Sequence, residues 1–595
     1  MFRTLSTIGT LLVGIGIGSL FSDVLFVREV QLQERHLNEG TAAETWDRRF
    51  RRNAPAFDSL RAAHATQCRT VLLPEPTDFV WVHEAFVADN GTIAYFVGQT
   101  GRKCWRDKNQ WPWSKAKASQ SRFFGKRFVA ELNDVVPSEL ARHLPRSSMF
   151  SICRNLPHNS SQFDEQVVLI ACPIPADLQD VLRLSPYVHL QAWLHFVGDE
   201  APRGEAVLPA SFLDQSGAPW ATLKRGPFQL CQMTTDVHFG AVPGSKVAKL
   251  IEASHVPLSL SRRVKIGACA HIAPVTDYRL VEWVEFHLLM GIEHFWFFDN
   301  SQKPSQSTAK ILLPYVLAGQ ATLIHWPFPI QDGCDQSQAG AQFSVGNVCL
   351  RRYAQDADWL AFFDVDEFLL PLRRNSTLTT LVDRFSRPDW QTVRSDESSF
   401  LCSRSRLGRV GCDTAERGVS AISLSQYIFA PCANPALGQA LDPALSFLHL
   451  ANDSCAEEPM TIQSADRAPK SLYRSYRSFS VWVHYLDVML AGTVVVILDW
   501  RHDALLVHCR RGRIGASMDD DTRVVNARVA AILPELARNV VRFEMTHNIS
   551  ILAMRQREDE LAAEQLKLFG PNRAYLVSYE ADEKKTITKN STTKV

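Results

Sequence analysis

One segment in the first half of the chain has hydrophobic and polar residues that alternate with a period of two. In Val188–Phe196, apolar residues alternate with His, Gln and Trp, a pattern typical of a β-strand with one buried face. Phe79–Val82 and Thr92–Val97 are further β-prone runs. The Asn90-Gly91 pair between them predicts a hairpin turn. We therefore predict a β-rich unit over residues 71–260.

The second half of the chain has a different pattern, in which runs of strand length alternate with segments of helical period. Val264–Ala270 predicts a strand, and Tyr278–Met290 predicts a helix because its apolar residues recur on one face. Phe295–Phe298 and Trp359–Phe363 are continuous apolar runs that predict buried strands. Alternating strands and helices are the signature of an α/β layer, so the fold class that we expect for residues 261–520 is α/β.

The N-terminal segment indicates a membrane anchor. Leu5–Val27 is apolar apart from Ser, Thr and Asp23, and it is long enough to cross a hydrocarbon core of about 30 Å. Arg3 is the only charged side chain before this run, and no Ala-x-Ala-like cleavage site follows it. We predict an uncleaved signal anchor in a single-pass protein, with the rest of the chain on the lumenal side.

The sequence divides into six predicted segments. They are a signal anchor (1–27), a charged and polar stem (28–70), a β-rich lumenal accessory domain (71–260), a catalytic domain (261–520), a C-terminal helical region (521–582) and a disordered tail (583–595). The helical region rests on two stretches, "RVVNARVAAILPELARNVVRFEM" and "ILAMRQREDELAAEQLKLF", and we expect Pro534 to interrupt it. The tail is polar and lacks the apolar residues that a core needs.

Composition and charge narrow the function classes. The 595 residues are 46% hydrophobic, which excludes wholesale disorder and a polytopic membrane protein. The formal net charge is +1, so the chain has no broad attraction for nucleic acid and we expect no nucleic-acid partner. The 13 cysteines form no CxxC pair, which argues against a zinc ribbon. In an oxidising lumen several of them should form disulfides.

An Asp-x-Asp tripeptide is the candidate for catalytic chemistry. It occurs three times, as Asp356/Asp358, Asp364/Asp366 and Asp519/Asp521. Only Asp364/Asp366 directly follows an apolar strand, where an open α/β sheet presents its ligand groups. Two carboxylates can hold a divalent cation that also binds a diphosphate, and neutralising a nucleotide diphosphate is what a sugar transferase needs.

Two other interpretations of this motif remain open. The two carboxylates can be structural groups that cap the next element. Haloacid-dehalogenase-like phosphatases also carry Asp-x-Asp after a strand, with the first Asp as nucleophile. In those enzymes the fifth position is Thr or Val, whereas here it is Phe368.

Five segments together resemble a known family. They are "DYRLVEWVEFHLLMGIEHFWFFDNS", "LLPYVLAGQATLIHWPFP", "NVCLRRYAQDADWLAFFDVDEFLLPL", "APKSLYR" and "LLVHCRR". Their order is that of glycosyltransferase family 92, which the chain resembles over roughly residues 262–375 and more loosely over 465–515. The resemblance implies a GT-A-type nucleotide-sugar-binding sheet in a type II Golgi membrane protein. It also implies an inverting galactosyltransferase that uses UDP-galactose, Mn²⁺ and a glycan acceptor.

The resemblance also implies roles for individual residues. Asp364 and Asp366 would be the metal–diphosphate pair, and Asp299 would lie near the uridine. His508 would be a further metal ligand, and a neutral imidazole suits Mn²⁺ better than Mg²⁺. Lys470 would contact phosphate. Without the resemblance, His508 would be interpreted as an ordinary strand-end histidine and Lys470 as a surface lysine.

The acceptor side departs from the family pattern. The segment "TVRSDESSFLCSRSRLGRV" replaces the family's usual acceptor motif, and Cys509 stands where the family has Tyr. Inversion needs a base near the acceptor hydroxyl, for which Asp396 and Glu397 are the candidates; either can equally be a surface charge. A transferase-like glycan-binding protein without activity is therefore the competing interpretation. The sequence is compatible with a homodimer.

The first prediction concerns topology. Six N-x-S/T sequons, at Asn90, Asn159, Asn375, Asn452, Asn548 and Asn590, follow the apolar Leu5–Val27 run. We expect the chain expressed in cells to be membrane-bound and N-glycosylated, and its gel mobility to shift when N-glycans are removed. A cytosolic, unglycosylated protein would contradict the predicted anchor.

Overall fold

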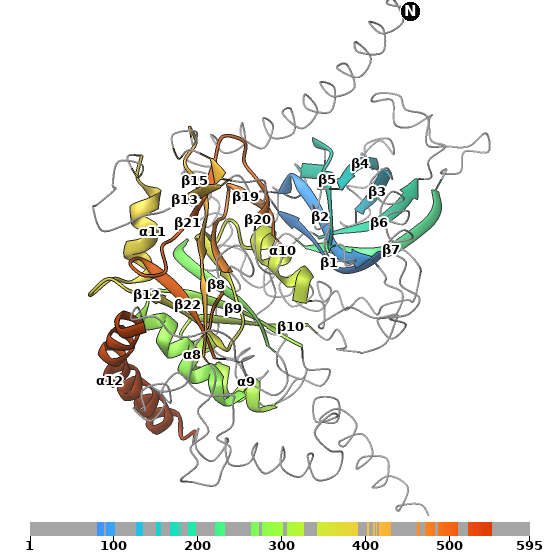
Figure 1. Cartoon of the computed structure of the whole chain (residues 1–595). Coiled ribbons are helices and arrows are strands. Elements are labelled where there is room, and N and C mark those ends of the chain that lie inside the picture. The colour runs from blue at the N-terminus through green and yellow to red at the C-terminus, as the bar shows by residue number, and fades with distance from the viewer. Residues whose placement is uncertain are drawn as a thin grey trace, which may run out of the picture. The chain divides into compact units, whose positions relative to one another are not determined.

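The structure is a computed structural model of the chain (Figure 1). It describes residues 80–88, 91–100, 127–134, 150–155, 167–176, 178, 179, 182, 189–197, 221–231, 263–272, 277–300, 306–326, 342–388, 390, 401–403, 409, 410, 412, 416–429, 461–463, 470–481, 486–509 and 522–549. The predicted anchor, stem and tail lie outside these residues. No helix within the described ranges is long and apolar enough to cross a membrane. The domain bounds given above stay predictions.

Seven strands between residues 80 and 231 close into a barrel (Figure 1). In barrel order they are β1 (Val80–Ala88), β2 (Ile93–Thr100), β5 (Val167–Pro173), β4 (Phe150–Asn155), β3 (Arg127–Asp134), β6 (His189–Val197) and β7 (Ala221–Cys231). β1 and β2 pair antiparallel, which confirms the predicted hairpin. Gly91 between them has φ +84°, a conformation that glycine adopts without strain. On β6 the buried residues alternate as predicted, with Leu190, Ala192 and Leu194 inside.

A nine-stranded sheet forms the centre of the second half, in the order β10-β9-β8-β11-β18-β15-β21-β13-β14. Its strands are β8 (Val264–Ile272), β9 (His294–Asp299), β10 (Ala321–His325), β11 (Ala357–Phe362), β13 (Leu401–Ser403), β14 (Arg409–Val410), β15 (Val419–Leu424), β18 (Lys470–Arg474) and β21 (Val494–Ile497). The first four strands of the order are mutually parallel, whereas β18 runs antiparallel to β11. The expected α/β fold class is confirmed for this part of the chain, which is a mixed α/β structure.

The helices follow the strands as the sequence pattern predicts. They are α8 (Asp277–Leu289), α9 (Gln306–Leu317), α10 (Gln342–Arg352), α11 (Leu378–Ser386) and α12 (Thr522–His547). α8 buries Leu280, Trp283 and Val284 on one face, and the chain leaves it through Gly291, which has φ +94°. All six residues of β9 are buried, as expected for a parallel strand covered on both faces.

The described part of the second half also contains two smaller sheets. One has the order β12-β22-β16-β17 and consists of β12 (Glu367–Pro371), β16 (Gln426–Phe429), β17 (Thr461–Gln463) and β22 (Ala504–Cys509). The other pairs β19 (Ser478–Val481) with β20 (Leu486–Met489). The chain passes from β11 of the large sheet to β12 of the smaller one through only four residues, 363–366. That short connection carries the Asp364/Asp366 motif.

α12 departs from the prediction at Pro534. We expected this proline to interrupt the helical region, but α12 runs through it without a break. A proline inside a helix removes one main-chain hydrogen bond. The buried face of α12, which includes Ile532, Leu536 and Val540, offsets that loss by packing into the core. α12 lies against α8 (Figure 1). The second amphipathic stretch of the predicted region lies outside the described residues.

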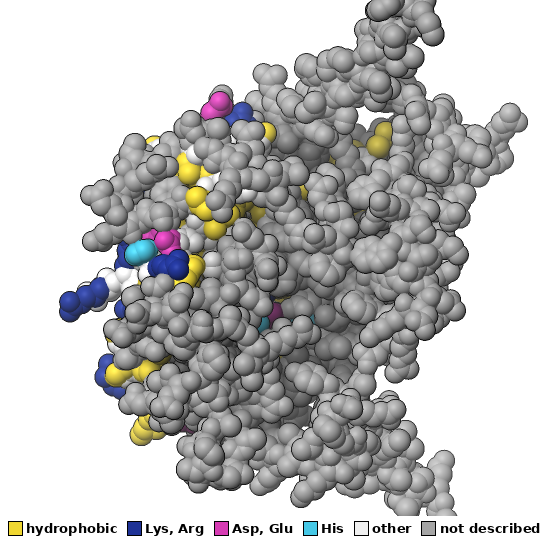
Figure 2. All heavy atoms as spheres, viewed as in Figure 1, with side chains coloured by type: hydrophobic (Ala, Val, Ile, Leu, Met, Phe, Trp, Pro, Cys, Tyr) yellow, Lys and Arg dark blue, Asp and Glu magenta, His cyan; other side chains and the backbone are white. Residues whose placement is uncertain are grey.

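Three disulfides among the described residues confirm that several cysteines pair. Cys153–Cys172 lies in the barrel, Cys269–Cys349 joins β8 to α10, and Cys402–Cys412 lies at the far edge of the large sheet. Figure 2 shows described side chains of hydrophobic, basic and acidic type in small mixed patches on one face of the molecule.

Gly267 on β8 lies against the ring of Trp296, so a substitution there tests the packing of the large sheet. A Cβ at this position would overlap the six-membered ring of Trp296, which is buried and stacks on Tyr353 at a centroid distance of 4.6 Å. We expect Gly267→Ala to lower the free energy of unfolding by about 1–3 kcal/mol through overpacking. The loss should shrink in a Trp296→Leu background. Urea unfolding of the four proteins measures this, and equal losses in both backgrounds would contradict the proposed clash.

Candidate functional site

The Asp364/Asp366 motif forms a tight turn between two sheets. The main-chain N–H of Glu367 donates to the carbonyl oxygen of Asp364 at 3.1 Å. β12 begins at Glu367 and pairs with β22, and the register places Glu367 opposite His508. The turn therefore carries three carboxylates, those of Asp364, Asp366 and Glu367, to the point where the large sheet and the smaller sheet meet.

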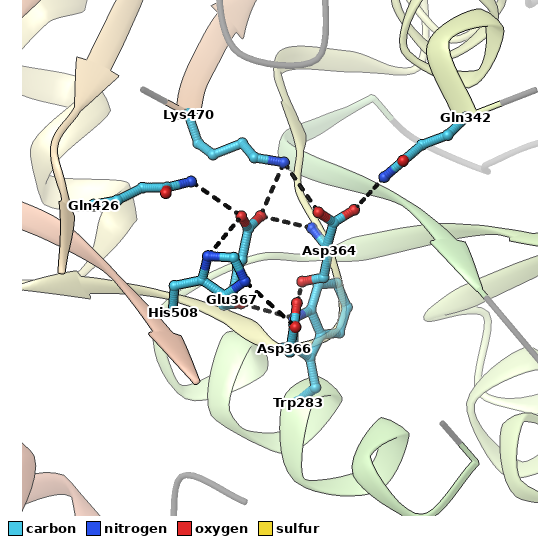
Figure 3. Close-up of polar contacts among 8 residues, drawn as sticks. All are labelled: Trp283, Gln342, Asp364, Asp366, Glu367, Gln426, Lys470 and His508. Carbon is cyan, nitrogen blue, oxygen red and sulfur yellow. Dashed lines mark hydrogen bonds and ion pairs between the residues drawn. The ribbon is translucent and has the colours of Figure 1, made fainter. Parts of the chain in front are cut away.

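Both carboxylate oxygens of Asp364 are held by other side chains (Figure 3). Oδ1 accepts a hydrogen bond from Nε2 of Gln342 at 2.6 Å, and Gln342 is the first residue of α10. Oδ2 accepts from Nζ of Lys470 at 3.3 Å. Lys470 lies on β18, next to β11 in the sheet, and its side chain is only 1% exposed.

Glu367 is the buried centre of the cluster. Its Oε2 accepts from the main-chain N–H of Asp364 at 2.8 Å and from Nζ of Lys470 at 3.1 Å. Its Oε1 accepts from Nε2 of Gln426 at 3.2 Å. Burial raises the pKa of Glu367 to about 7, although the Lys470 charge opposes this rise.

The ammonium of Lys470 is the main positive charge against these carboxylates. Burial alone would lower the pKa of Lys470, but the charges of Asp364 and Glu367 raise it above its ordinary value. The lysine therefore stays charged at neutral pH. The phosphate contact of Lys470 stays a prediction; in this structure its partners are the carboxylates of Asp364 and Glu367.

Asp366 and His508 face each other on the more open side of the cluster. Nε2 of His508 lies 3.4 Å from Oδ2 of Asp366, and the Asp366 side chain is 25% exposed. Nδ1 of His508 points towards Glu367, 3.7 Å from Oε1. Burial alone would lower the pKa of His508, but its hydrogen bond to Asp366 and the neighbouring carboxylates raise it.

Three further site residues were predicted from the sequence: Asp299, Asp396 and Glu397. Asp299 ends β9 and is fully buried, so in this conformation its side chain exposes no surface to a nucleotide. Its main-chain carbonyl accepts from the N–H of Trp326 at 2.7 Å. The uridine contact of Asp299 stays a prediction. Asp396 and Glu397 lie outside the described residues, so the catalytic base also stays a prediction.

Three residues of the cluster were not predicted from the sequence: Gln342, Glu367 and Gln426. Glu367 carried a signal in the sequence, because it is a charged residue at the start of the apolar run "FLLPL", where a buried charge requires a partner. The two glutamines carried none, since only the folded chain brings them to the carboxylates.

The donor set fits a divalent cation that shares its coordination with a substrate. Among the described residues, no group of three or more His, Cys, Asp or Glu side chains could hold a metal by itself. The metal contact of Asp364 stays a prediction; its two carboxylate oxygens accept from Gln342 and Lys470 here. Asp366 and His508 offer an oxygen and a nitrogen donor 3.4 Å apart. At phosphate-binding sites Mg²⁺ is commonly held by one or two carboxylates together with phosphate oxygens and water, and an imidazole ligand suits Mn²⁺. A site with one carboxylate and one imidazole therefore suits a Mn²⁺ ion that also binds a nucleotide diphosphate.

The buried ion pairs of Lys470 lead to a prediction about the free energy of unfolding. Lys470→Met leaves Glu367 buried without its cation, and breaking a buried pair in this way costs about 3–5 kcal/mol. Losing the lysine also raises the pKa of Glu367 further. The carboxyl is then protonated at pH 6, and the loss should be smaller there than at pH 8.

Urea unfolding of the purified protein at the two pH values measures this effect. Lys265→Met is the matched control, because Lys265 pairs with Asp383 at the surface. It should change the free energy of unfolding by no more than about 0.5 kcal/mol at either pH. A loss for Lys470→Met that does not vary with pH would contradict the assigned role of Glu367.

Comparisons with known proteins cover this part of the chain. Residues 267–406 match the family described as Glycosyltransferase family 92. The Arabidopsis thaliana protein named galactan beta-1,4-galactosyltransferase GALS1 is 34% identical over 134 residues, which are 22% of this chain and 25% of that relative. The Caenorhabditis elegans protein named beta-1,4-galactosyltransferase galt-1 is 24% identical over 164 residues, which are 25% of this chain and 38% of the relative.

The matched part of the chain thus spans about a quarter of the plant relative and about two fifths of the nematode one. It includes α8, the turn at Asp364–Glu367 and Gln342, whereas Lys470 and His508 lie beyond residue 406. The resemblance inferred from sequence motifs is confirmed over this range. Residues 267–406 of this chain are similar to the domain that defines glycosyltransferase family 92.

Proposed function

We propose that this chain is a metal-dependent inverting glycosyltransferase with a GT-A-type catalytic domain, which transfers galactose from UDP-galactose to a glycan acceptor. The observation that carries the proposal is the pair formed by Asp366 and His508 at the open side of a buried charge cluster. Its acidic turn lies within the family 92 match. Both relatives are named as galactosyltransferases, which supports galactose as the donor sugar.

The first requirement of the proposed mechanism is to neutralise the negative charge of the diphosphate in UDP-galactose. Asp366 and His508 would hold a divalent cation such as Mn²⁺, and the cation would neutralise charge on the UDP leaving group. Lys470, Gln342 and Glu367 hold Asp364 and the turn in place. Because these partners are already in position before substrate binds, the site requires little rearrangement during the reaction.

The transfer itself needs a base on the acceptor side. The acceptor oxygen attacks C1 of the galactose from the face opposite UDP, the bond between C1 and the phosphate oxygen breaks, and UDP departs with the electron pair. The acceptor proton passes to a carboxylate, for which Asp396 or Glu397 is the proposed group. Attack from the opposite face inverts the configuration at C1.

The proposed location is the lumen of the Golgi, with the chain anchored by residues 1–27. Three disulfides among the described residues support an oxidising compartment. The six sequons are compatible with it. A chain that had kept its nucleotide site but lost transfer would bind UDP with the metal and yet release no product from any UDP-sugar.

Asp366→Asn tests the proposed site. The substitution keeps the volume of the side chain but removes one negative charge from the metal pair. We expect turnover, measured as UDP release from UDP-galactose with an accepted glycan, to fall by about 10²–10³-fold. UDP affinity, measured by calorimetry, should no longer increase when Mn²⁺ is added.

Asp358→Asn is the matched control. Asp358 belongs to another Asp-x-Asp tripeptide, pairs with Arg263 at 2.7 Å and is 56% exposed. Its loss should leave turnover and metal-dependent UDP binding unchanged. Melting temperatures of both variants verify that they are folded. A folded Asp366→Asn protein with wild-type turnover would rule out the mechanism.

A further inference from the structure

The indole of Trp283 lies behind the acidic turn. Trp283 is on α8 and is fully buried. Its single N–H is shared by two carbonyl oxygens, those of Glu367 at 2.9 Å and Asp364 at 3.1 Å (Figure 3). Bifurcated hydrogen bonds of this kind occur in proteins. Here the two acceptors are the first and last residues of the turn that carries Asp366.

The two carbonyls fix the ends of the turn. Asp364 also accepts the N–H of Glu367 at 3.1 Å, so its carbonyl oxygen has two donors. Asp366 lies between the two anchored residues, and its side chain is the more exposed member of the pair with His508. Because the turn is short, a shift of either anchored carbonyl would move the Asp366 carboxylate relative to Nε2 of His508.

Packing leaves the indole little freedom to move. Its ring centroid lies 4.9 Å from that of Phe363 and 5.4 Å from that of Phe295. His287, one helical turn further along α8, lies 4.5 Å from the indole. A close-packed ring is a fixed donor, since side chains in protein cores occupy defined rotamers.

His287 extends the same support to β12. Burial lowers the pKa of His287 to about 3, so the ring is neutral at physiological pH. Nδ1 then donates to the carbonyl of Trp283 at 2.8 Å, and Nε2 accepts from the N–H of Leu369 at 3.2 Å. α8 thus holds both the turn and the strand that follows it.

We propose that Trp283 is a positioning residue for the divalent cation: its N–H fixes the turn so that Asp366 and His508 converge on one ion. The inference rests on the function proposed above. A buried tryptophan generally fills the core, and for that role only the ring is needed. The role proposed here depends in addition on the indole N–H, which donates to the two carbonyls of the turn.

Trp359 provides a matched control within the same sheet. It lies on β11, is buried to a similar extent, and its indole N–H donates to Oγ of Ser386 at 3.2 Å. The same substitution at the two positions removes a similar ring and one indole N–H. Only Trp283 contacts the carbonyls of the acidic turn through that N–H.

The experiment compares Trp283→Phe with Trp359→Phe by calorimetric titration of Mn²⁺ into each protein in the presence of UDP. We expect the affinity for Mn²⁺ to fall by about 10–100-fold in Trp283→Phe, the range seen when outer-shell partners of metal ligands are lost, and to be unchanged in Trp359→Phe. The metal concentration for half-maximal UDP release should rise in parallel. Equal Mn²⁺ affinity in the two variants would overturn the proposal.

A second replacement separates the N–H from the ring if Trp283→Phe does not fold. Benzothienylalanine, introduced by genetic code expansion, keeps the bicyclic ring and replaces only the N–H by sulfur. Weaker Mn²⁺ binding supports the proposal, and wild-type binding overturns it. The outcome is distinguishable from failure of the proposed function, because that function fails if Asp366→Asn keeps wild-type turnover, whatever the Trp283 variants do.

Discussion

The site depends on how three neighbouring carboxylates are balanced by charge. Asp364, Asp366 and Glu367 lie within four residues of one another, and their mutual repulsion would disfavour ionisation of all three in a partly buried place. The Lys470 ammonium lies between two of them, and His508 faces the third. Lys470 and His508 lie on strands more than 100 residues later in the chain. The two sheets must therefore be assembled before the acidic turn can be held in its present shape.

The parts of this structure that depend on neighbouring residues could be predicted from the sequence. The hairpin at Asn90-Gly91, the helix at Tyr278–Met290 and the position of Asp364 and Asp366 after a buried strand all rest on period, length and turn residues. Such features are fixed by neighbours in sequence, so the pattern of side chains reveals them.

The remaining features depend on contacts between distant segments. The register that sets Glu367 opposite His508, and the glutamines that reach Asp364 and Glu367, exist only once β12, β22 and α10 have packed. The helix at Pro534 is another feature that the local sequence does not determine. A local rule predicts a break, whereas tertiary packing of the buried face keeps α12 continuous. Asp299 lies at the predicted strand end, but its complete burial depends on the elements that cover β9.

The division of the charge cluster along the chain has a consequence for dissecting this protein. The carboxylates lie before residue 406, within the family 92 match, and the lysine and histidine that balance them lie after it. A chain split between residues 406 and 470 would therefore place the three carboxylates on one fragment and Lys470 and His508 on the other. Each fragment would lack the counter-charge that the other supplies, so split-protein complementation at this point would couple reassembly of the halves directly to formation of the site.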